Sequence, residues 1–112
     1  MAINKIVRGT TPNIECKFAG DVTYNRFMFS VGSDLETPWF SVRWQDMKSE
    51  YDKHDDMTVI KFQLSQQQTL SCKPGKAIAQ FRAIDESGFA NVSNIVSLEI
   101  EDILKDGVIS YA

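Results

Sequence analysis

Residues 13–18 read NIECKF, a stretch in which apolar and polar residues alternate one by one. This period of two is typical of a β-strand with one face in a core and one in solvent, because successive side chains of a strand point to opposite sides. Helical periodicity is nearly absent from the sequence, so we predict an all-β fold. The same alternation recurs in residues 26–31, 40–45, 59–64, 76–84 and 95–100.

The segments between these stretches carry signals for turns and for one helix start. Residues 85–88 fit a short hairpin loop that joins the last two predicted strands, in which Gly88 takes a positive φ. Ser65 and Gln68 have the spacing of a capping box, which predicts one short helical turn near residues 65–70. About seven short strands with such turns favour an immunoglobulin-like Greek-key β-sandwich, and a small barrel is the alternative.

Two stretches of the sequence are harder to interpret. Residues 49–56 read SEYDKHDD and form a concentrated polar segment, which we interpret as a solvated hairpin loop. Both faces of residues 76–84 contain apolar residues, and the pattern does not say which face lies in the core. One face consists of Ala77, Ala79, Phe81 and Ala83, and the other of Ile78, Gln80, Arg82 and Ile84.

Length and composition describe one ordinary domain. The chain has 112 residues, 43% of them hydrophobic and 24% charged, and a chain of this size can fold without metal or disulfide crosslinks. We therefore treat residues 1–112 as a single domain with apolar arms at residues 1–8 and 101–112. The net charge of −3 predicts neither nucleic acid nor a membrane as partner, because both present anionic surfaces.

The first residues and the cysteines indicate a reducing compartment. The amino terminus lacks the apolar stretch of a signal peptide, and nowhere do about 18 apolar residues follow one another as in a membrane span. We therefore expect the chain to be made and kept in a cytoplasm. Cys16 and Cys72 are predicted to stay unpaired and buried, as small hydrophobic residues do.

The sequence contains few residues in patterns that support catalysis. The single histidine, His54, lies among charged neighbours, and general acid–base or nucleophilic catalysis needs a partner within reach. Asp52, Asp55 and Asp56 lack the ligand spacing of a calcium loop. The glycines are scattered singly and form no phosphate-binding loop. We predict a protein that is not an enzyme and that uses no metal or cofactor.

Three aromatic residues are candidates for ligand contact. Trp39, Tyr51 and Phe89 fall on predicted outer faces or in loops, and exposed aromatic rings are a common feature of sugar-binding surfaces. Packing of these rings on the sandwich edge or on a neighbouring chain is the favoured interpretation.

The two ends of the chain are more informative than its middle. A lone domain usually frays at its termini, so apolar residues there predict segments that dock, either back on the domain or on another subunit. If both are arms for a partner, removal of residues 1–7 or 103–112 leaves a folded domain. The candidate interface residues are Ile3, Ile6, Val7, Ile103, Leu104, Val108 and Ile109.

A set of motifs distributed over nearly the whole chain supports a resemblance to a known family. The motifs are VRGTTP at 7–12, the segment 62–81 with its LSQ and PGK, SNIV at 93–96 and LKDGVI at 104–109. With these motifs the chain resembles small virion structural proteins of tailed bacteriophages and prophages of Gram-positive bacteria. That group is similar to the immunoglobulin-like amino-terminal domain of phage baseplate upper proteins.

The resemblance implies a non-enzymatic building block of the phage particle. Such a protein belongs to the tail, baseplate or neck or decorates the capsid, and it binds other virion proteins and copies of itself. It is located in the virion and, during assembly, in the host cytoplasm. The alternative function is an immunoglobulin-like module that binds carbohydrate or a host surface.

Overall fold

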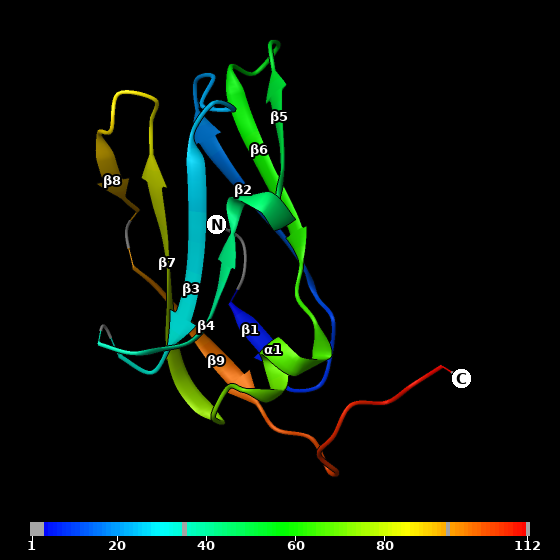
Figure 1. The fold of residues 1–112 in the computed structure, drawn as a ribbon. Helices are drawn as coiled ribbons and strands as arrows, with labels where there is room; N and C mark the ends of the chain where they lie inside the picture. The colour runs from blue at the N-terminus through cyan, green and yellow to red at the C-terminus, as the bar shows by residue number, and fades with distance from the viewer. Residues whose placement is uncertain (1–3, 35, 94, 112) are drawn as a thin grey trace.

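The computed structural model describes residues 4–34, 36–93 and 95–111, which form two β-sheets packed in a sandwich-like arrangement (Figure 1). The larger sheet has the strand order β1-β9-β7-β3-β4, with β8 also paired to β7, and the smaller sheet has the order β2-β6-β5. The predicted all-β fold is thus confirmed. The strands are β1 Lys5–Val7, β2 Asn13–Ala19, β3 Arg26–Gly32, β4 Pro38–Arg43, β5 Lys48–Asp52, β6 Met57–Gln63, β7 Gly75–Ile84, β8 Ala90–Val92 and β9 Val96–Glu101.

The core lies between the two sheets and is built from the apolar positions of the alternating stretches. Aromatic rings connect the sheets at its centre: the ring of Phe29 lies 4.9 Å from that of Phe81 in the same sheet and 5.2 Å from that of Phe62 in the opposite sheet. The buried apolar residues are Ile6, Ile14, Cys16, Phe27, Phe29, Val31, Val42, Ile60, Phe62, Leu64, Cys72, Ala77, Ala79, Phe81, Leu98 and Ile100.

The structure decides which face of residues 76–84 lies in the core. The alanine face of β7 is buried, and the face with Gln80 and Arg82 is turned outward. In the strand register Ala79 lies opposite Val31, and Ala77 lies opposite Leu98. The small alanine side chains leave room for these larger neighbours, so the volumes of adjacent strands complement one another.

The structure has nine strands in its described residues, where the sequence predicted about seven. The polar stretch 49–56 is one reason, because its first half belongs to strand β5, which pairs with β6, and only its second half, residues 53–56, forms the turn. Since β5 is the edge strand of its sheet, it needs no continuous apolar face. The predicted strand 40–45 ends early, and residues 44–46 form the 3-10 turn η1 (Trp44–Asp46).

The short helical turn appears where it was predicted. Helix α1 (Gln66–Leu70) begins after Ser65, whose hydroxyl accepts a hydrogen bond from the Gln68 N–H. The Gln68 side chain in turn accepts one from the Ser65 N–H. This capping box confirms the helix start, because it satisfies two backbone donors that the first turn leaves free.

The predicted loop at residues 85–88 is also present. The Gly88 N–H donates to the Asp85 carbonyl at 3.1 Å, and Gly88 has a φ of 87°. The loop joins β7 to the short strand β8, which the sequence pattern did not separate from the following strand. Both β8 and β9 pair with β7, each along a different part of it.

The two cysteines are unpaired and buried, as predicted. Cys16 lies on β2, whereas Cys72 follows α1. Burial raises the pKa of Cys72 to about 11, because a thiolate loses its hydration when it leaves water. Both residues therefore act as small core side chains.

Candidate functional site

The amino-terminal segment belongs to the body of the domain. Residues 5–7 form β1, which pairs in parallel with β9, and Ile6 lies opposite Ile100 with only 1% of its surface exposed. The expectation that Ile6 is an interface residue is therefore wrong, because its side chain is already part of the core. Val7 is half-buried in the same strand. Ile3 lies outside the described residues.

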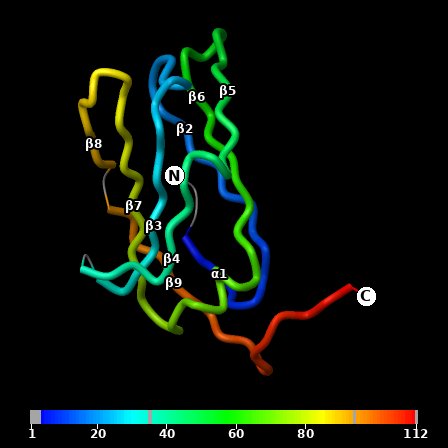
Figure 2. The backbone as a smooth tube through the Cα atoms, in the orientation of Figure 1, coloured from blue at the N-terminus to red at the C-terminus, as the bar shows by residue number. Residues whose placement is uncertain are grey.

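The carboxy-terminal segment leaves the body after β9 ends at Glu101. Residues 102–111, which we call the carboxy-terminal arm, run away from the two sheets as a chain without helix or strand (Figure 2). Ile103 is half-buried at the start of the arm. The other large apolar side chains of the arm are exposed: Leu104 by 106%, Val108 by 56%, Ile109 by 80% and Tyr111 by 110%.

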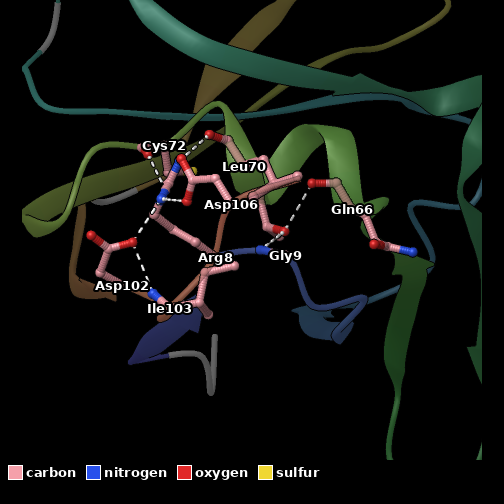
Figure 3. A network of polar contacts seen from close by, with 9 residues as sticks. Arg8, Gly9, Gln66, Leu70, Cys72, Asp102, Ile103 and Asp106 are labelled. Atoms are coloured by element: carbon pink, nitrogen blue, oxygen red, sulfur yellow. Dashed lines mark hydrogen bonds and ion pairs between the residues drawn. The ribbon is translucent and has the colours of Figure 1, made fainter. Parts of the chain in front are cut away.

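The start of the arm is fixed by Arg8, whose side chain is only 12% exposed (Figure 3). Its Nη1 donates to Asp102 and to Asp106, each at 2.6 Å, and its Nη2 donates to the second oxygen of Asp106 at 3.2 Å. Two backbone carbonyls at the end of α1 complete the set: Nη2 donates to Leu70 and Nε to Cys72, each at 3.0 Å. Every N–H of the guanidinium thus has an acceptor, an arrangement that the three donors of a lysine cannot reproduce.

The loop after β1 places Arg8 in this position. Thr69 of α1 is fully buried, and its hydroxyl accepts from the Gly9 N–H at 3.0 Å and donates to the Thr10 carbonyl at 2.9 Å. Gly9 has a φ of 80°, and a Cβ there would lie 3.0 Å from the Cδ1 of Ile103. A side chain at this position would therefore strain the backbone and press on the start of the arm.

A second contact holds the arm near its far end. The side-chain amide of Gln66 donates to the Ile109 carbonyl at 3.0 Å, and its oxygen accepts from the Ile109 N–H at 2.8 Å. The amide thus bonds both backbone groups of one residue, as a neighbouring strand would. The arm thus has two anchors, Arg8 and Gln66. Its side chains Leu104, Val108, Ile109 and Tyr111 remain exposed to solvent.

The charge state of Asp102 makes the first anchor sensitive to acid. The Arg8 guanidinium and the Ile103 N–H hold the pKa of Asp102 below its usual value of 3.8. A carboxyl with a lowered pKa contributes stability above that usual value, and the contribution disappears as the pH falls through the pKa of the folded state. The Arg8–Asp102 contact is therefore complete at neutral pH and is lost only in acid.

We expect the start of the arm to loosen when the pH falls from neutral through the lowered pKa of Asp102, because protonated Asp102 no longer attracts Arg8. The heteronuclear NOE of the amides in residues 103–109 measures this, and it should drop while the NOE of the strands stays constant. The Arg8→Gln variant should show a reduced NOE already at neutral pH. Lys5→Gln is the matched control, since the Lys5–Glu101 pair is exposed and lies 3.4 Å apart. An unchanged NOE in acid would contradict the role of this contact.

The three aromatic candidates are not brought together. Trp39 on the edge strand β4 is half-buried and packs against the core, which corrects its predicted position on an outer face. Tyr51 is half-buried on β5 of the other sheet and donates its hydroxyl to Asp56 at 2.5 Å, which raises the pKa of Tyr51. Phe89 is 67% exposed in the loop before β8. They come from two edge strands and one loop, and among the described residues no ring contact joins them.

His54 and the acidic residues around it form the tip of the β5–β6 hairpin. The backbone N–H groups of His54 and Asp55 both donate to the Asp52 carboxylate, which closes the turn. Within residues 4–34, 36–93 and 95–111, no group of three His, Cys, Asp or Glu side chains is arranged to hold a metal ion.

In comparisons with known protein families and with curated proteins, the chain matches none. The parts of the chain that the structure describes contain no helix with the length and apolar character of a membrane span. The anchored arm is therefore the feature from which we argue function.

Proposed function

We propose that this chain is a non-enzymatic structural subunit of a bacteriophage virion, which binds neighbouring virion proteins through its carboxy-terminal arm. It would belong to the tail, baseplate or neck or decorate the capsid, and we propose an immunoglobulin-like Greek-key topology for its sandwich. The observation that carries the proposal is the arm itself. It exposes Leu104, Val108, Ile109 and Tyr111 to water although Arg8 and Gln66 hold its backbone in place.

The physical argument begins with the free energy of these exposed side chains. Burial of one large apolar side chain contributes about 1.5–3 kcal/mol, so a groove on a neighbouring protein that takes up several of them stabilises an assembly. The two anchors lower the conformational entropy that the arm loses on binding. In a particle with many linked copies, each contact can be modest because the others keep the subunit in place.

The alternative, a carbohydrate- or host-surface-binding module, has less support. A sugar-binding surface needs several exposed aromatic and polar groups close together. Trp39, Tyr51 and Phe89 lie on β4, on β5 and in the β7–β8 loop, and only Phe89 is largely exposed.

The experiment compares particles assembled with the full chain and with a chain that ends at residue 106. The shortened chain keeps both carboxylates that Arg8 binds, so its unfolding midpoint should be close to that of the full chain. We expect the full chain in the mass-spectrometric inventory of purified virions and the shortened chain only in the host cytoplasm. A ring-like copy number would indicate tail or neck, and a capsid-like number would indicate decoration.

Point variants of the arm separate its apolar side chains from its length. We expect Val108→Ser combined with Ile109→Ser to lose incorporation, and Lys105→Ser on the same arm to keep it. Normal incorporation of the shortened chain, or absence of the full chain from purified virions, would contradict the proposal.

A further inference from the structure

A group of arginines lies on the outer face of the larger sheet and takes no part in the proposed contact of the arm. Three of the four arginines in the sequence, Arg26, Arg43 and Arg82, line one open cleft of about 300 Å³. They come from strands β3, β4 and β7, which lie side by side. Trp44 and Ile84 form part of the cleft wall and are 41% and 43% exposed.

The strand register explains why these side chains converge. Met28 on β3 lies opposite Arg43 on one side and Arg82 on the other. The Cα atoms of Arg43 and Arg82 are therefore separated by two strand spacings across the sheet, about 10 Å. Arg26 is two residues before Met28 on the same strand and points to the same side. Its guanidinium lies over the Trp44 ring at 4.6 Å from the centroid.

Within residues 4–34, 36–93 and 95–111, no carboxylate neutralises the positive charge of this cleft. In the described residues the lining of the cleft contains no carboxylate, and none of its three arginines forms an ion pair. Arg8, by contrast, is paired with two aspartates. Three like charges that share one cleft repel each other, and a carboxylate placed between them would relieve the repulsion.

The remainder of the same chain supplies carboxylates in excess. The whole chain has twelve basic and fifteen acidic residues, so the surface outside the cleft is more acidic than the net charge of −3 suggests. One group of acidic residues lies at the tip of the β5–β6 hairpin, which projects at one end of the molecule (Figure 1) and also carries Lys53 and His54. Three aspartates lie within residues 52–56.

One of these aspartates is available for a contact between copies. Asp52 accepts hydrogen bonds from the backbone of its own turn, and Asp56 accepts one from Tyr51. The Asp55 side chain is exposed and, among the described residues, has no hydrogen-bond or ion-pair partner. With three aspartates and one lysine in residues 52–56, the tip keeps an excess of negative charge, opposite to the charge of the cleft.

We propose that the arginine cleft binds the acidic β5–β6 hairpin tip of a second copy of this chain, with Asp55 between Arg43 and Arg82. The contact deepens the proposed function, because it supplies a means by which copies of a repeated virion subunit bind one another. It uses a surface other than the arm, so its test is independent of incorporation into particles.

The test is a charge exchange measured by sedimentation equilibrium of the purified full chain at low salt. The wild-type chain should associate, and added salt should weaken the association. Arg82→Glu and Asp55→Lys should each weaken it at least about tenfold. Combined in one chain, the two substitutions should recover part of it, because the exchange restores one oppositely charged pair while Arg26 and Arg43 stay positive.

Controls keep the outcomes distinct. Lys61→Glu replaces a positive by a negative charge, as Arg82→Glu does, but on the outer face of the smaller sheet. It should leave association unchanged. All the substituted side chains are exposed, and circular dichroism checks that each variant is folded. A monomeric wild-type chain, or a double variant that stays as weak as the single ones, would overturn the proposed contact. Either result would leave the arm proposal standing, since that proposal is tested in virions.

Discussion

Replacement of Phe29 by alanine is expected to lower the free energy of unfolding by about 3–5 kcal/mol, the range for loss of a buried aromatic ring. The Phe29 side chain is fully buried and packs against the rings of both Phe62 and Phe81. Its removal leaves a cavity at the point where the two sheets meet, and neighbouring strands cannot close it without breaking their register. A domain of this size has only about 5–15 kcal/mol of stability in total.

Urea unfolding followed by tryptophan fluorescence measures the effect. The urea concentration at the midpoint should fall strongly. The slope of the unfolding free energy against urea concentration should stay nearly constant, because the same surface is exposed on unfolding. Phe89→Ala is the matched control: Phe89 is 67% exposed, so we expect a change of less than about 0.5 kcal/mol. Similar losses for the two variants would argue against the position of the core.

The second large effect concerns the amino-terminal strand. Ile6→Ala is expected to cost about 2–5 kcal/mol, and removal of residues 1–7 should prevent stable folding. The reason is that β1 covers the edge of β9 and contributes Ile6 to the core. This result would reverse the expectation, based on sequence, that the domain folds without residues 1–7.

A matched pair of truncations tests the difference between the two ends. On heating, the chain that lacks residues 1–7 should show no cooperative unfolding transition, whereas the chain that lacks residues 107–112 should lose only a little stability. Equal losses would mean that the arm also belongs to the core, or that β1 does not. Val7→Ser is a milder probe, since Val7 is only half-buried in β1.

Alternation predicted those strands in which one face is fully apolar. Residues 13–18 and 26–31 obey the rule and lie within observed strands, and residues 59–64 do so except for the last residue, which follows β6. The rule failed for β5, because an edge strand with one half-buried face tolerates polar residues. It also failed for β1 and β8, each of which has three residues, since a period of two cannot be recognised over so short a length.

The candidate site was predicted only in part. The apolar residues of the arm stood out, because apolar side chains beyond the last strand have no place in the core. Arg8 and Gln66 did not, although Arg8 belongs to one of the motifs quoted for the resemblance. Their partners lie 94 and 43 residues away along the chain, and no local pattern marks contacts over such separations. The three arginines of the cleft are equally scattered in sequence.

The order of polar and apolar residues therefore decides the class of fold, the start of α1 and the burial of the two cysteines, because these depend on neighbours a few residues away. Tertiary structure alone decides that one apolar end is a core strand and the other an exposed arm. The physical reason is that the ends have similar composition, whereas only one of them finds an unpaired strand edge and a space in the core beside Ile100.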